Sequence, residues 1–126
     1  MLITDKKDGW NEKVNFTDEN DVFVGFDSSE QCCEVSGWYL SREININQPS
    51  EDGACGFEID GYNFETSFFE EKLECGESGD ENFAIFKLTK AEHEDLYLHL
   101  YNHHNGYYSH GFDATVGGEV WVAGSL

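Results

Sequence analysis

Residues 96–101 alternate leucine with aromatic or imidazole side chains, and this alternation constrains the fold more than any other feature of the sequence. Leucine occupies every second position, and Tyr97, His99 and Tyr101 stand between. A period of two residues is typical of a β-strand with one buried face. The segment therefore predicts a strand whose leucines face the core and whose other face is solvent-exposed, a second layer or a site.

A tight turn is predicted directly after this strand. Asn105-Gly106 is typical of a two-residue type I′ turn and predicts a hairpin in which His99 faces Phe112. Strand alternation then places one group of side chains opposite the leucines: His99, Tyr101, His103, Tyr108, His110 and Phe112. His104 and Tyr107 fall on the leucine face. Histidine and tyrosine combine an apolar body with a polar tip, so the face is typical of a contact surface.

The chain is strongly acidic, with 26 acidic and 7 basic residues and a net charge of -19. It has no basic stripe to neutralise phosphates, which argues against direct binding to nucleic acid or to an anionic membrane. Residues 51–81 contain eleven acidic residues, among them Glu70, Glu71 and Glu74, and one basic residue. This charge is compatible with steered binding to a basic protein surface; the alternative is that it serves solubility alone.

The fold class predicted from these patterns is mainly β, with α+β as the alternative. The 126 residues, of which 15% are aromatic, fit one ordered domain over 1–126. Further strands are expected at 21–26, 37–41, 82–89 and 119–123, and a hairpin or bulged strand at 56–66. A capping-box pattern at 67–70 favours at most one short helix near 67–75. We expect a single antiparallel domain that forms a sheet or an open barrel.

The start of the chain resembles neither a secretion signal nor a membrane anchor. No apolar stretch follows a basic region, and no apolar run is long enough to cross a bilayer. We therefore expect a cytoplasmic protein without a membrane partner. In that compartment Cys32, Cys33, Cys55 and Cys75 are expected to be reduced, and the lack of a C-x-x-C pair disfavours a zinc ribbon or a redox motif.

The sequence Gln31-Cys32-Cys33-Glu34 allows two interpretations. A thiol beside a carboxylate is a poor nucleophile, so the first interpretation treats the cysteines as small apolar residues of the core. Alternatively, one thiol meets a histidine of the late hairpin in a metal site or a Cys–His pair. The histidines alone do not suffice, because His99 and His103 would lie about 13 Å apart along one strand. No triad, phosphate loop or calcium loop is present, so we expect neither a catalytic residue nor a required cofactor.

Two short anchors carry a family resemblance. Gln31-Cys32-Cys33-Glu34 and Asn105-Gly106-Tyr107-Tyr108-Ser109 resemble elements of an uncharacterised family of small domains from bacteria and their phages. Members carry a Gln-Asp-Cys-Cys-Glu element after an early strand and an Asn-Gly-Tyr-Tyr-Ser element in a late hairpin. The aspartate is missing here, because Gln31 directly precedes the cysteines. The resemblance implies a small β-rich fold and a phage- or defence-related setting, and it implies no catalytic residue.

Together these features predict a non-enzymatic acidic binding protein, an inhibitor or an immunity- or anti-defence-type protein that mimics nucleic-acid charge on a basic partner surface. Its contact residues would be Glu70, Glu71 and Glu74 with the His/Tyr face. If the chain is phage-encoded, it would act in the host cytoplasm. One alternative is a small-molecule or metal pocket that joins two sets of residues: Cys32, Cys33 and Glu34 with His103, His104, Tyr107, Tyr108 and His110. Another is an enzyme with the same residues, such as a Cys–His hydrolase.

Overall fold

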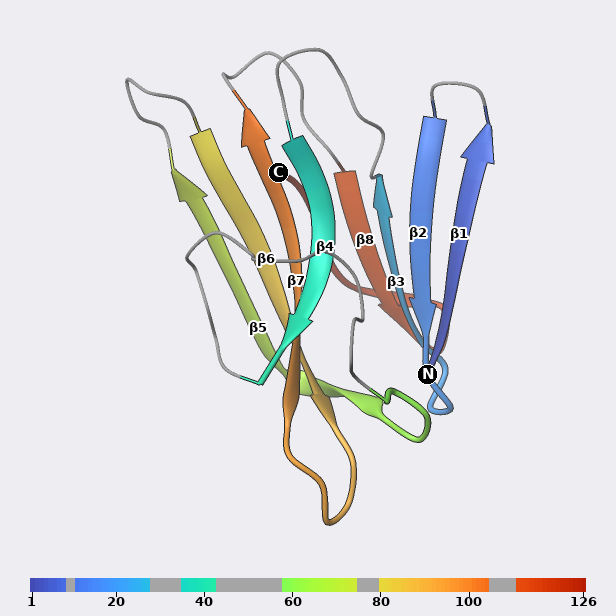
Figure 1. Cartoon of the computed structure of the whole chain (residues 1–126). Helices are drawn as coiled ribbons and strands as arrows, with labels where there is room; N and C mark the ends of the chain where they lie inside the picture. The colour runs from blue at the N-terminus through green and yellow to red at the C-terminus, as the bar shows by residue number, and fades with distance from the viewer. Residues whose placement is uncertain (9–10, 28–34, 43–57, 75–79, 105–110) are drawn as a thin grey trace.

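The chain folds into two antiparallel β-sheets (Figure 1). The computed structural model describes residues 1–8, 11–27, 35–42, 58–74, 80–104 and 111–126, and these contain nine strands and no helix. The strands form one sheet of five and one of four, and the sheets do not close into a barrel. The mainly-β prediction is thus confirmed in its all-β form.

The first sheet joins strands from both ends of the chain. Its order is β1 (Leu2–Asp8), β2 (Asn11–Thr17), β3 (Val22–Asp27), β8 (Gly111–Val116) and β9 (Glu119–Ser125). The second sheet has the order β4 (Val35–Ser41), β7 (Leu96–His104), β6 (Asp80–Thr89) and β5 (Asn63–Glu74). In the second sheet β5, β6 and β7 form a meander, and β4 lies beside β7 rather than beside β5, which is a Greek-key arrangement.

The two sheets share one hydrophobic core. The leucines of β7 face it, as the alternation predicted, and Leu98 and Leu100 are both 0% exposed. Aromatic side chains cross from sheet to sheet: Phe16 of β2 packs edge-on against Trp38 of β4, with ring centroids 5.0 Å apart. Phe86 of β6 likewise contacts Phe112 of β8 at 6.4 Å. Such edge-to-face pairs add to the free energy gained by burying apolar area, so these rings fix how the sheets face each other.

A buried carboxylate also joins the two sheets. Asp18, in the turn between β2 and β3, is only 8% exposed. Its Oδ1 accepts hydrogen bonds from the backbone N–H groups of Asn20 and Val22, each at 2.9 Å. Its Oδ2 accepts one from Phe64 N–H of β5 at 2.8 Å. Three donors compensate the cost of burying this charge. The bond from Phe64 also ties the first sheet to the start of β5 in the second sheet.

The predicted pairing of His99 with Phe112 is wrong. Strand β7 lies between β4 and β6, so both of its edges are already paired, and His99 is opposite Tyr39 and Ile85. Phe112 is in β8, in the other sheet, where it faces the core. An Asn-Gly pair specifies a local turn but not how far a ladder continues beyond it, and burial of Phe112 decides the longer-range pairing. The predicted turn falls in 105–110, outside the described residues.

The short helix that the sequence allowed near 67–75 does not form within the described residues, because positions 67–74 belong to β5. Ser67 does not cap a helix: its hydroxyl donates to Glu65 at 2.8 Å, and its N–H donates to the same carboxylate at 3.3 Å. A bulge between Phe64 and Phe69 absorbs the irregular spacing, and Phe69 then pairs with Phe86 of β6. Pairing with β6 and burial of these rings outweigh the local capping pattern.

Candidate functional site

The outer face of the second sheet, the face turned away from the shared core, contains several of the predicted site residues. His99 and Tyr101 of β7 lie on it, as does Glu70 of β5. In one cross-strand row the partners are Tyr39, His99, Ile85 and Glu70. In the next row they are Gly37, Tyr101, Phe83 and Lys72. The structure therefore brings His99, Tyr101 and Glu70 onto one face.

Most of the centre of this face is buried. His99 is 0% exposed and Tyr101 3% exposed, and Tyr39, Phe83 and Ile85 are also buried. Tyr39, Phe83 and Tyr101 form a second hydrophobic cluster, separate from the core between the sheets. The sequence left three roles for this face: exposed to solvent, packed in a second layer, or part of a site. The burial of His99 and Tyr101 fits the second of these. Neither side chain is accessible for direct contact with a partner.

The imidazole of His99 is held by two residues of β4. The Tyr39 ring stacks on it with centroids 4.4 Å apart and planes inclined by 8°. Ser41 Oγ lies 2.9 Å from His99 Nε2, at hydrogen-bond distance. Burial raises the pKa of Tyr39 to about 12, so its phenol stays neutral at physiological pH. Sequence analysis missed both partners. The alternation in 37–41 places Tyr39 and Ser41 on one face, but nothing local indicates that β4 pairs with β7.

The Ser41–His99 distance is that of a nucleophile and its base, which raises the question of catalysis. The imidazole, however, is completely buried under a stacked tyrosine, and both residues lie within regular paired strands. A reacting group could not reach the imidazole without displacing Tyr39. The geometry is that of a buried polar residue whose Nε2 is paired with a neighbouring hydroxyl.

At one end of the β4–β7 ladder, the first residue of β4 is paired with a histidine of β7. Val35 is the register partner of His103, and Glu34 directly precedes Val35 in the chain. On the other side of β7, His103 is opposite Glu81 and His104 is opposite Asp80. Several predicted site residues lie outside the described ranges: Cys32, Cys33, Glu34, Tyr107, Tyr108 and His110.

The predicted acidic residues follow β5, which is an edge strand of the second sheet. Glu70 and Glu71 are exposed, and they point to opposite faces because they are neighbours in a strand. Glu71 Oε2 reaches the first sheet, where a Cβ added to Gly124 of β9 would be 3.2 Å from it. Glu74 is the last residue of β5 and is the register partner of Glu81. The edge therefore presents carboxylates on both sides of the strand.

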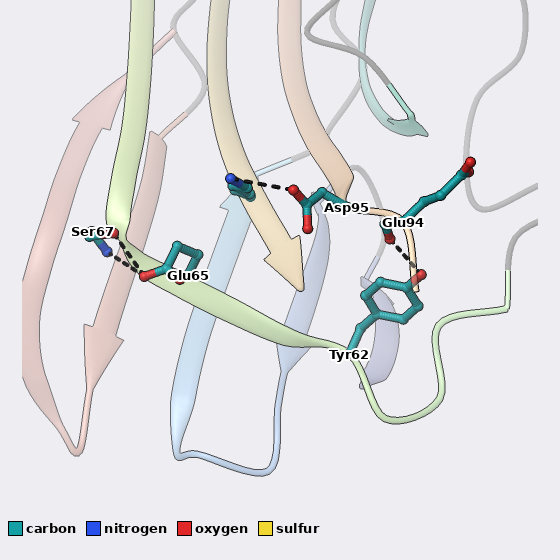
Figure 2. Close-up of polar contacts among 6 residues, drawn as sticks. Tyr62, Glu65, Ser67, Glu94 and Asp95 are labelled. Atoms are coloured by element: carbon teal, nitrogen blue, oxygen red, sulfur yellow. Dashed lines mark hydrogen bonds and ion pairs between the residues drawn. The ribbon is translucent and has the colours of Figure 1, made fainter. Parts of the chain in front are cut away.

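Polar contacts gather at the opposite end of β5, where Figure 2 shows Ser67 with Glu65 and the ion pair of Asp95. Lys87 Nζ lies 3.4 Å from Asp95, and Arg42 Nε lies 3.0 Å from Glu94. Lys90 Nζ donates to the carbonyl of Asp60 at 3.0 Å. Near the same end, hydrogen bonds from Ser67 lower the pKa of Glu65 below its usual range, so that carboxylate is ionised. Within the described ranges, no ion pair joins Glu70 or Glu71 to a basic residue.

Neither a metal cluster nor a membrane helix occurs among the described residues. No three His, Cys, Asp or Glu residues in that part of the chain are grouped as ligands for an ion. The same part of the chain holds no helix long and apolar enough to span a bilayer. Comparisons with protein-family models, with curated proteins and with solved structures returned no match for this chain.

Proposed function

We propose that this is a non-enzymatic acidic binding protein that occupies a basic surface of a partner protein, as an inhibitor or immunity-type protein does. The observation that carries the proposal is the pair Glu70 and Glu71, exposed on an edge strand and joined to no basic residue within the described ranges. Unpaired surface carboxylates attract lysine and arginine on a partner, and the charge of -19 extends that attraction.

The proposed contact surface is the acidic edge of β5, defined by Glu65, Glu70 and Glu71. Glu74 follows them at the end of the strand. The surface differs from the one expected from sequence, because His99 and Tyr101 are buried and contribute no direct contact. They lie beside the edge on the same face instead, since His99, Ile85 and Glu70 occupy one cross-strand row of the sheet. A rigid sheet holds the carboxylates at fixed spacing, which reduces the entropy lost on binding.

The decisive experiment measures affinity for a basic protein captured from a cell extract and then purified. The double variant Glu70→Gln/Glu71→Gln is compared with a control of equal charge change on the first sheet, Asp5→Asn/Glu119→Gln. Loss of two contact charges, about 1.4 kcal/mol together, is expected to weaken binding about tenfold. The control variant is expected to bind nearly as well as the wild type.

Ionic strength gives a second readout of the same proposal. Between 50 and 500 mM NaCl the association rate should fall steeply, because salt screens charges across the encounter distance. An affinity that does not change with salt would contradict electrostatic recognition. Equal weakening by the two double variants would instead show that β5 is not the contact surface.

A Cys/His pocket is the second candidate function, and one observation favours it. The register pairs Val35 with His103, so the chain position next to Glu34 lies opposite a histidine. A small ligand or metal ion held between these motifs would accompany the purified protein. Elemental analysis and native mass spectrometry of untagged protein test this candidate, and a mass equal to that of the bare chain, without metal, counts against it.

A further inference from the structure

The outer face of the first sheet, turned away from the core, differs in character from the rest of this acidic molecule. One row of cross-strand partners crosses all five strands: Leu2, Thr17, Phe23, Thr115 and Val120. None of them is charged. Leu2 is 63% exposed and Val120 75% exposed, so the row ends on both sides in accessible aliphatic side chains. Two such residues on opposite edges of one face form an apolar band rather than an isolated surface leucine.

The centre of this face is flat. The ring of Phe23 lies over Gly25, two residues along β3, and a Cβ at Gly25 would be 3.0 Å from the Phe23 ring. The Asn15 side chain closes the other side of the same glycine at 3.2 Å. Because Gly25 has no side chain, the phenylalanine can lie along the sheet instead of projecting from it. The result is a platform of the kind on which another sheet stacks face to face.

Both signs of charge occur among the described side chains of this face, although the chain carries -19 overall. Lys6 and Lys13 are neighbours at one corner, on β1 and β2. Asp27 and Asp113 supply the opposite charge from β3 and β8. Two copies of a chain this acidic repel each other in most of the relative orientations in which they can meet. A face on which lysines lie beside aspartates, and which an apolar band crosses, weakens that repulsion at the point of contact.

We propose that the outer face of the first sheet is the interface of a homodimer, covered by a second copy of this chain. A twofold axis along β3 places Phe23 against Phe23 and brings Leu2 to Val120 of the second copy, a self-complementary match. The same operation brings the lysine corner of one copy to the half of the face that carries Asp113 in the other. It also sets Asp27 near Asp27 of the second copy, each beside its register partner Lys13. The acidic edge of β5 is on the other sheet, so it stays free for its own partner.

The size of the face sets the expected strength of this dimer. Five strands and three rows cover a flat area of roughly 24 by 20 Å, or about 500 Å² per copy. Interfaces at the small end of the observed range are weak and reversible. The expected dissociation constant is therefore in the micromolar range.

Sedimentation equilibrium of the full chain between about 5 and 500 µM tests the proposal. A monomer–dimer equilibrium is expected, and it should tighten severalfold from 50 to 500 mM NaCl because salt screens the repulsion between two copies. Val120→Glu and Leu2→Glu should each weaken it at least tenfold. The matched control is Val116→Glu: this valine of β8 is 38% exposed but lies outside the apolar band, so its substitution should leave the equilibrium unchanged.

Substitution at such exposed positions is expected to preserve the fold, which far-ultraviolet circular dichroism and the melting temperature check. A chain that stays monomeric at every concentration in both salts would overturn the proposal. So would a dimer that Val120→Glu leaves intact. Backbone amide shifts recorded on dilution give an independent map, and changes confined to β5 rather than centred on Phe23 would also exclude this interface.

Discussion

Asp18 shows how much one residue can contribute to joining two sheets. Its two oxygens accept three backbone hydrogen bonds, two from its own turn and one from Phe64 of the other sheet. Removing the carboxylate leaves buried N–H donors without an acceptor, which costs more than the net value of the bonds themselves. We expect Asp18→Ala to lower the free energy of unfolding by about 3–5 kcal/mol.

Urea denaturation measures this effect, and the neighbouring turn supplies a control. Asp21 has φ 62°, a conformation that aspartate and asparagine both tolerate, and its side chain is exposed. Asp21→Asn should therefore change stability by less than about 0.5 kcal/mol. A stability of Asp18→Ala within 1 kcal/mol of the wild type would show that the turn rearranges to satisfy its donors.

Tyr39 gives the stability a dependence on high pH. Its folded-state pKa is raised to about 12 by burial, whereas the unfolded chain ionises its phenol near pH 10. Between these values the unfolded state releases a proton that the folded state retains, so stability falls as pH rises from about 10 towards 12. Melting temperatures at closely spaced pH values should fall in the wild type and fall less in Tyr39→Phe. Tyr97→Phe, a half-buried tyrosine on the same face, should keep the wild-type decline.

At the scale of the elements, two strands carry a glycine beneath a phenylalanine ring. The two rings differ in how far they can move to make room for an added side chain. At Gly124 of β9 an added Cβ would lie 3.1 Å from the Phe112 ring, which is 3% exposed and packs against Phe69 and Phe86. At Gly25 the ring belongs to the half-buried Phe23. We expect Gly124→Ala to destabilise by about 1–3 kcal/mol because its ring is confined, and Gly25→Ala by less.

Thermal unfolding of the two alanine variants tests this difference directly. A larger loss at Gly25 than at Gly124 would mean that the platform on the outer face is more rigid than its exposure indicates. Both variants keep the strand backbone, because neither glycine has the positive φ that only glycine adopts easily.

Strands with strong local patterns could be predicted from sequence, and their pairing could not. Alternating or β-branched apolar residues identified β3, β4, β6, β7 and β9. Strands β1 and β2 were missed, because charged and polar residues separate their few core positions such as Val14 and Phe16. The face that carries His99 was assigned correctly from alternation. Its burial was not, since alternation sorts side chains by face and says nothing about what covers either face.

At the scale of the whole molecule, the charge of -19 opposes folding through self-repulsion. Salt screens this repulsion, and the ion pairs that it also weakens are exposed ones of low value, such as Arg42 with Glu94. At pH 7 we expect 0.5 M NaCl to raise the melting temperature by about 5 °C, from roughly 1 kcal/mol of relieved repulsion. Near pH 4.2, the isoelectric point, the same salt should have little effect. A melting temperature that falls with salt at pH 7 would contradict this prediction.

The pairing of β3 with β8 also bears on the order in which the molecule is made. Eighty-nine residues separate the end of β3 at Asp27 from the end of β8 at Val116. A ribosome adding about 5–20 residues per second needs roughly 5–20 s to cover that distance. Throughout that interval β3, with Val22, Val24 and Phe26, has a partner only on its β2 side. The nascent chain therefore exposes one edge of an apolar strand to other polypeptides until β8 is synthesised. A ribosome-associated chaperone, or a change in translation rate across this stretch, would change the yield of folded protein.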